Sequence, residues 1–138
     1  MSGSASLPPS APCVSVLVVE DERIISLALA SMLRGLGLQV SACVPSGEAA
    51  LELLLHHTPD LVLLDIHLEG KLDGIATAQA MRERNGPPVA FTTAYTDSET
   101  IKRAMALKPL AFLSKPLAPH DIQKLVAGLA GPGGSAER

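Results

Sequence analysis

The sequence is short of aromatic residues: it has no tryptophan, one tyrosine and two phenylalanines, so that aromatics make up 2% of its 138 residues. Hydrophobic residues nevertheless account for 47% of the chain. Its core must therefore consist mainly of Leu, Val, Ile and Ala side chains. A chain of this length is expected to form one domain with a substantial core.

Three further absences limit the classes of function. The net charge of −3 gives no basic surface, so we expect no nucleic-acid binding by this domain. No apolar run approaches the roughly 18 residues of a membrane span, and the N-terminal residues lack the basic start and apolar core of a signal peptide. We therefore expect a cytoplasmic protein without membrane contact.

One apolar segment ends in a carboxylate. Leu61–Leu64 is a run of four aliphatic residues, and Asp65 follows it directly. A continuous apolar run of this length is typical of a strand that is buried on both faces of a parallel sheet. Asp65 should then emerge at the carboxyl edge of the sheet, where ligands bind in open α/β folds.

Strand-like and helix-like segments alternate five times along the chain. The expected strands are 14–19, 39–44, 61–65, 89–93 and 111–113. This alternation predicts right-handed crossovers and an α/β fold, a doubly wound five-stranded parallel sheet of (βα)5 flavodoxin-like type with strand order 2-1-3-4-5. We expect a domain over 13–130, a disordered leader over 1–12, and a flexible tail or truncated linker over 131–138.

The helices have recognisable faces and ends. Ser46 is the expected N-cap of the second helix, which should stop at Thr58, and Thr96 with Glu99 resembles a capping box for the fourth. A third helix should start at Gly74. The inward stripe of the first helix is predicted to be Ile25, Ala28, Leu29, Met32, Leu33 and Leu36.

The two cysteines match no metal or redox spacing. Cys13 precedes the first strand and Cys43 lies near the end of the second, so parallel neighbours place them roughly 17 Å apart. We expect small buried or edge residues that form no disulfide, because a disulfide needs Cα atoms within about 7 Å.

The predicted strand order brings acidic residues together. Its switch point lies between the first and third strands, so Glu20 and Asp21 should flank the same crevice as Asp65. Carboxylates this close repel one another, and a hard divalent cation relieves the repulsion. The expected cofactor is Mg²⁺, with Mn²⁺ as an alternative.

The residues that follow the other strands suit phosphoryl transfer. A carboxylate such as Asp65 can attack phosphorus and form an aspartyl phosphate. Thr93 at the end of the fourth strand offers a hydroxyl, and Lys115 after the fifth offers an ammonium group. Phosphoryl transfer needs mostly positioning and charge neutralisation, so this set is sufficient.

These motifs together resemble the receiver domain of two-component response regulators. The resemblance covers residues 14–129 and rests on the motif positions Glu20–Asp21, Asp65, Thr93–Ala94, Phe112 and Lys115–Pro116. It implies that Asp21 and Asp65 bind Mg²⁺ directly, that Glu20 acts through a water molecule, and that His67 offers its backbone carbonyl. It also implies a cis peptide bond between Lys115 and Pro116.

The resemblance further implies a signalling cycle. A sensor histidine kinase, a phosphotransfer protein or a small phosphodonor would phosphorylate Asp65, and the protein would catalyse only its own phosphorylation and dephosphorylation. Thr93 and Phe112 would then switch the face formed by the fourth helix, fifth strand and fifth helix for a downstream effector or output domain. Dimerisation through that face is left open.

Side chains beside the phosphoryl group should affect its lifetime. By the resemblance, His67, Ala94 and Tyr95 flank it. His67 and Tyr95 are bulky, which predicts slow self-dephosphorylation.

Two departures from the family pattern are visible. The loop 66–74 lacks the usual proline and is one residue longer, and the first acid is Glu20 rather than the commoner aspartate.

Two other functions are compatible with parts of the sequence. A degenerate receiver would serve only for docking and need not bind Mg²⁺, but the motif residues are intact. A small phosphatase with an aspartyl nucleophile often has a second aspartate two residues later, where this chain has His67. Mg²⁺ titration and phosphomonoester turnover discriminate between these alternatives.

Overall fold

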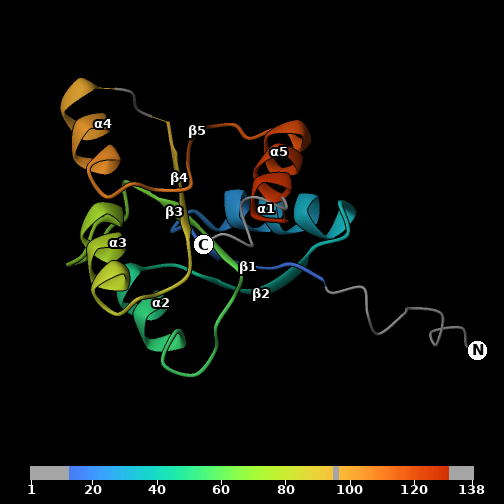
Figure 1. Ribbon diagram of the computed structural model, residues 1–138, viewed down its shortest axis with the longest axis horizontal. Helices are drawn as coiled ribbons and strands as arrows, with labels where there is room; N and C mark the ends of the chain where they lie inside the picture. The colour runs from blue at the N-terminus through green and yellow to red at the C-terminus, as the bar shows by residue number, and fades with distance from the viewer. Residues whose placement is uncertain (1–12, 95–96, 131–138) are drawn as a thin grey trace, which may run out of the picture.

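The computed structural model describes residues 13–94 and 97–130 (Figure 1). The expected leader and tail, and residues Tyr95 and Thr96, lie outside the described residues. The elements in chain order are β1 (Ser15–Val19), α1 (Arg23–Gly35), β2 (Gln39–Val44), α2 (Gly47–Leu53), β3 (Leu61–Asp65), α3 (Gly74–Glu83), β4 (Val89–Thr93), α4 (Ser98–Met105), β5 (Ala111–Ser114) and α5 (Pro119–Ala130).

The strands form one parallel sheet in the order β2-β1-β3-β4-β5, which confirms the predicted topology. Helices α1 and α5 cover one face of the sheet, and α2, α3 and α4 cover the other (Figure 1). Consecutive strand residues alternate between the two layers. Leu61 and Leu63 pack toward α1 and α5, whereas Val62 and Leu64 pack toward the opposite helices.

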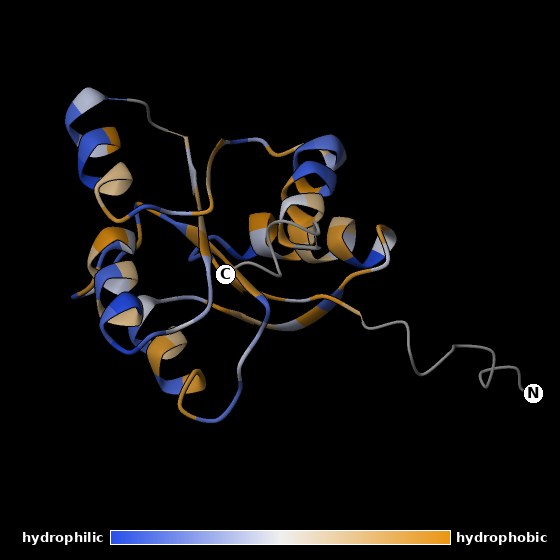
Figure 2. Cartoon of the chain, viewed as in Figure 1, coloured by the Kyte–Doolittle hydropathy of each residue, from blue (hydrophilic) through white to orange (hydrophobic). Residues whose placement is uncertain are grey.

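The central strand β3 is buried along its whole length, as the continuous apolar run predicted. Figure 2 shows the hydrophobic colouring concentrated on the sheet and on the helix faces turned toward it. Burial of β3 on both faces fixes the position of its last residue, Asp65.

Helix α4 starts differently from the prediction. Asp97, not Thr96, is its N-cap, and Asp97 Oδ1 accepts the Thr100 backbone N–H at 2.9 Å. The capping-box assignment was therefore wrong, because the aspartate carboxylate reaches the orphan amide from one position later. By contrast, Ser46 is the N-cap of α2, where its Oγ accepts the Ala49 N–H at 3.1 Å.

Two helices differ from the prediction in other ways. The buried face of α1 includes the small residues Ser26 and Ala30, so that Ala28, which was predicted to face inward, is exposed. Helix α2 ends at Leu53, well before the predicted stop at Thr58, because the chain continues as a turn after the helix.

Cys13 and Cys43 are free and exposed, so the buried alternative of the prediction is wrong, whereas the edge alternative holds for Cys43. Cys43 lies on β2, which is an edge strand with alternating exposure. Within the described ranges, no helix is long and apolar enough to cross a membrane.

Candidate phosphoacceptor site

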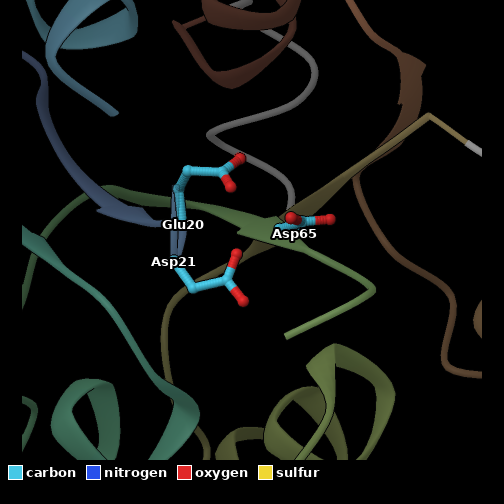
Figure 3. A group of neighbouring side chains, drawn as sticks. All are labelled: Glu20, Asp21 and Asp65. Carbon is cyan, nitrogen blue, oxygen red and sulfur yellow. The ribbon is translucent and has the colours of Figure 1, made fainter. Parts of the chain in front are cut away.

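Three carboxylates meet at the carboxyl edge of the sheet (Figure 3). Glu20 and Asp21 directly follow β1, and Asp65 is the last residue of β3. Each offers one carboxylate oxygen, and these oxygens all lie within 4.8 Å of one another. Because β1 and β3 are adjacent parallel strands, this convergence follows from the strand order that the sequence predicted.

Lys115 lies between two of these acids. Its Nζ donates to Glu20 Oε1 at 2.6 Å and to Asp65 Oδ2 at 3.0 Å. The three side chains are largely inaccessible to water, with exposed fractions of 15% for Lys115, 3% for Glu20 and 6% for Asp65. The ammonium group therefore neutralises carboxylates that would otherwise repel each other.

Burial and pairing shift the pKa values of Glu20 and Lys115. Burial raises the pKa of Glu20, and the Asp65 carboxylate adds to the rise, against the opposing effect of Lys115. Burial alone would lower the pKa of Lys115, but its hydrogen bonds with Glu20 and Asp65 outweigh it and raise that pKa. Lys115 is therefore a cation at neutral pH.

A backbone amide donates to one oxygen of each of the three carboxylate groups. The N–H of Glu22 donates to Glu20 Oε2, and the N–H of His67 donates to Asp65 Oδ1, both at 3.1 Å. The Glu69 N–H in the β3–α3 loop donates to Asp21 Oδ2, also at 3.1 Å. The acids are thus oriented before any ligand arrives.

Gly74 allows α3 to start directly against the phosphoacceptor candidate. Its N–H donates to Ile66 O at 2.8 Å. A Cβ at this position would lie 2.1 Å from the backbone oxygen of Asp65 and 2.6 Å from the Cα of Ile66. Only glycine fits, because both neighbours are backbone atoms that no rotamer change can move.

The candidate switch residues lie on the sheet face covered by α2, α3 and α4. Thr93 is fully buried at the end of β4, and its backbone oxygen accepts the Lys115 N–H at 2.8 Å. Phe112 on β5 is half-buried and lies in register with Phe91, packed against the same cluster. The peptide bond between Lys115 and Pro116 is cis, as the resemblance implied.

A groove of about 790 Å³ opens beside Asp65. His67 and Ala94 line it, in accordance with their predicted flanking positions, whereas Tyr95 lies outside the described residues. The groove has walls that the sequence analysis missed, formed by Glu69, Asp73, Thr100 and Arg103. The three-residue spacing of Thr100 and Arg103 places both on one face of α4, and this spacing could have indicated that they line the same surface.

The donor set suits a hard cation. Three carboxylate groups with oxygens this close, beside a groove open to solvent, match the oxygen ligands that Mg²⁺ prefers. The structure thus supports the coarse prediction of an acidic group that could hold a metal.

The sequence profile of the response regulator receiver domain matches residues 16–127. The chain belongs to this family. As a receiver domain it functions in two-component signal transduction, and the predicted resemblance is confirmed. Proteins of this family work with histidine kinases and output domains.

Among curated relatives, the transcriptional regulatory protein PdtaR of Mycobacterium tuberculosis is 34% identical over 107 residues, which cover 78% of this chain and 52% of PdtaR. The DNA-binding response regulator MtrA of Mycobacterium leprae is 32% identical and covers 78% of this chain and 47% of MtrA. The receiver domain therefore spans about half the length of these curated relatives.

Solved receiver domains share the fold. The signal receiver domain of a modulated diguanylate cyclase from Desulfovibrio desulfuricans G20 superposes with a TM-score of 0.78 at 34% identity, covering 83% of this chain and 91% of that one. The signal receiver domain of the putative response regulator NarL from Mycobacterium tuberculosis gives 0.76 at 29% identity, with coverage of 83% and 93%.

Proposed function

We propose that Asp65 is the phosphoacceptor of this receiver domain. The observation that supports this most strongly is the double contact of Lys115, whose Nζ binds both Asp65 and Glu20 at the edge of the sheet. A cation fixed beside a buried carboxylate is the arrangement that phosphoryl transfer requires, since negative charge must gather there.

Asp65 acts as the nucleophile. One of its carboxylate oxygens attacks the phosphorus of the donor and forms a new O–P bond. The bond from phosphorus to the donor breaks, and its electron pair leaves with the imidazole nitrogen of a phosphohistidine or with the carboxylate of an acyl phosphate. Lys115 then balances charge on the phosphoryl oxygens, and the Thr93 hydroxyl donates to one of them.

Mg²⁺, with Mn²⁺ as an alternative, is the proposed cofactor. Asp21 and Asp65 would hold it through their side chains, Glu20 through a water molecule and His67 through its backbone carbonyl. When bound, the cation adds positive charge where the phosphoryl oxygens lie. The orientation of Asp21 and Asp65 by the amides of Glu69 and His67 supports this assignment.

Phosphorylation is proposed to change the face formed by α4, β5 and α5. The phosphoryl group adds about −1.5 to −2 charge and three acceptor oxygens, toward which Thr93 moves. Phe112 then turns inward, and a downstream effector or output domain binds the altered face. Thr93→Ala should permit phosphorylation but weaken the response of the partner, and an unaltered response would argue against this coupling.

The phosphodonor protein is proposed to dock on α1. An apolar groove of about 470 Å³ borders Glu20 and Lys115, and it is lined mainly by apolar residues of α1 together with Pro116 and Leu117. Ile24, which belongs to this lining, is 82% exposed, and Leu27 of the same helix is 55% exposed. An exposed apolar face continuous with the reactive groups suits a helix of the partner that bears apolar residues around its phosphohistidine.

This docking surface is testable with a matched control. Ile24→Ser and Leu27→Ser should leave labelling by acetyl phosphate unchanged but reduce phosphoryl transfer from the cognate kinase, found by screening a panel of phosphorylated sensor kinases. Leu55→Ser is the control, because Leu55 is also 63% exposed but lies just after α2. Equal transfer to all variants would rule the surface out.

The decisive test of the phosphoacceptor is intact-protein mass after incubation with Mg²⁺ and acetyl phosphate, beside an Asp65→Asn control. We expect one phosphate adduct that hydroxylamine removes and that the control lacks. Failure to form the adduct together with failure to bind Mg²⁺ would favour a docking module. Turnover of a phosphomonoester would instead favour the phosphatase alternative.

The adduct is proposed to be long-lived. His67 is exposed and lines the groove beside Asp65, where a bulky side chain limits the approach of water. Replacing His67 and Tyr95 by small residues should accelerate loss of the phosphate, measured by intact mass over time. An unchanged rate would refute this shielding.

A further inference from the structure

Arg103 of α4 lines the same groove as Asp65, whereas the candidate reactive groups Asp65, Thr93 and Lys115 lie at or just after the ends of strands. Its guanidinium Nη2 lies 3.9 Å from Asp73 Oδ2, and the two side chains are 51% and 43% exposed. Both residues line the groove, Asp73 as the residue that precedes α3 and Arg103 as a residue of α4.

The groove is strongly acidic. Its lining in the described part of the chain contains five carboxylates and two permanent cations, namely Asp21, Glu22, Asp65, Glu69, Asp73, Lys115 and Arg103. Lys115 is already bound to Glu20 and Asp65. A small phosphodonor is an anion and must enter against these acids. Arg103 is the cation in this lining that is not bound to the acids of the phosphoacceptor site.

The ion pair between Arg103 and Asp73 is weak, so Arg103 can exchange it for another anion at little cost. A separation of 3.9 Å between half-exposed groups is typical of ion pairs that contribute little to stability. Asp73 is in addition occupied as the N-cap of α3, where its Oδ1 accepts the Ala76 N–H at 2.8 Å. The guanidinium fork, by comparison, matches a carboxylate or a phosphate with two parallel hydrogen bonds.

We propose that Arg103 binds the acyl group of a small acyl phosphate donor during transfer to Asp65, and so selects acyl phosphates over donors with an uncharged leaving group. This rests on the proposed phosphoacceptor role of Asp65. As the new O–P bond to Asp65 forms, the P–O bond of the donor breaks and its electron pair becomes the charge of the released carboxylate. Arg103, in the lining of the groove, stabilises that developing negative charge.

Phosphoramidate provides the comparison donor. At neutral pH its nitrogen is already protonated, so when the P–N bond breaks the electron pair leaves with the nitrogen as neutral ammonia, which has no negative charge for Arg103 to stabilise. Acetyl phosphate carries more negative charge and releases acetate. The contribution of Arg103 should therefore depend on the donor, which a purely structural role for the side chain would not produce.

The test is the rate of adduct formation with each donor in the presence of Mg²⁺, for wild type and Arg103→Gln. We expect kcat/KM for acetyl phosphate to fall by about tenfold and that for phosphoramidate by less than about twofold. Lys102→Gln is the control, since Lys102 is exposed on α4 but does not line the groove, and it should match wild type. Added salt screens the attraction between Arg103 and the donor, so it should narrow the difference in rate between wild type and Arg103→Gln.

Asp73→Asn supplies the reciprocal test. Asparagine keeps the N-cap of α3 but releases Arg103, so the acetyl phosphate rate should rise, and the rise should be smaller in combination with Arg103→Gln, where only the repulsion by the Asp73 charge is removed. Arg103→Lys keeps the charge without the fork and should give an intermediate rate. It also replaces Arg103→Gln if that variant does not fold.

The outcomes separate the two proposals. An adduct on wild type with both donors, and equal losses for both donors in the Arg103 variants, would overturn the role of Arg103 and leave Asp65 as the phosphoacceptor. A gain from Asp73→Asn that is equally large with and without Arg103 would also overturn it. Absence of any adduct on wild type with either donor would overturn this inference, and together with failure to bind Mg²⁺ it would overturn the proposed function as well.

Discussion

Replacing Lys115 by methionine should destabilise the protein in a pH-dependent way. The substitution keeps most of the aliphatic side chain but removes the ammonium group that bonds Glu20 at 2.6 Å and Asp65 at 3.0 Å. Two carboxylates that are 3% and 6% exposed would then face each other without a cation. Breaking a fully buried pair typically costs about 3–5 kcal/mol.

The site lies at the sheet edge beside an open groove, so nearby solvent screens part of this repulsion. We therefore expect the free energy of unfolding of Lys115→Met to fall by about 2–4 kcal/mol at pH 7 without Mg²⁺. Mg²⁺ should restore part of the loss, since a cation that binds only the folded state stabilises it.

The pH dependence follows from the direction of the pKa shifts. The pKa of Glu20 is already raised in the folded protein by burial, and loss of Lys115 should raise it further. An acid with a raised pKa favours folding below its unfolded pKa and loses that contribution as pH rises through its folded pKa. The difference between wild type and variant should therefore shrink as pH falls from 7 toward 5.

Urea denaturation followed by circular dichroism at several pH values measures this difference. Lys124→Met is the control, because Lys124 is exposed on α5, and it should change stability little at any pH. A destabilisation by Lys115→Met that stays constant between pH 7 and 5 would refute the electrostatic explanation and indicate lost packing instead.

Three further predictions concern the local structure. In the urea assay, Gly74→Ala should lower the free energy of unfolding by about 2 kcal/mol or more, because its Cβ would overlap the backbone of the acceptor strand. Gly128→Ala is its control: a Cβ there meets open space on α5, so the free energy of unfolding should rise by up to about 1 kcal/mol. Ser46→Ala should cost about 1 kcal/mol through loss of the α2 cap, and a neutral result by thermal melting would contradict the cap assignment. The backbone N–H of Thr100 lowers the pKa of Asp97, so the stabilisation by the α4 cap is present above the unfolded pKa of Asp97 and is lost as pH falls through the lowered folded pKa. Hydrogen exchange of the Thr100 amide should therefore accelerate in acid. An exchange profile without this acceleration would contradict the role of Asp97.

The arrangement of the reactive acids could be predicted because it depends only on strand order. Once the chain alternates five times between strand and helix, the residues that end β1 and β3 must lie side by side, and Glu20, Asp21 and Asp65 are those residues. Lys115 could be placed by the same reasoning at the end of β5. That it bonds both Glu20 and Asp65 could not, because β5 is two strands away from β3 and the reach of a long side chain decides the contact.

Helix ends and the groove walls were less predictable. Thr96 and Asp97 are both good N-cap residues, and no local sequence pattern selects Asp97 as the N-cap of α4. Arg103 and Asp73 face each other because α4 packs beside the start of α3, and no local sequence pattern encodes that juxtaposition. Such contacts between helices depend on tertiary packing.

The uneven burial of the strands implies an uneven resistance to local opening. β3 is inaccessible to solvent along its whole length, whereas all four residues of β5 at the edge of the sheet are partly exposed. Amides of β3 should then exchange with solvent only on global unfolding, and those of β5 through smaller fluctuations. We therefore expect the strand that ends in Asp65 to be the more rigid part of the sheet, and the edge strand that carries Phe112 to be the part that rearranges at lower cost.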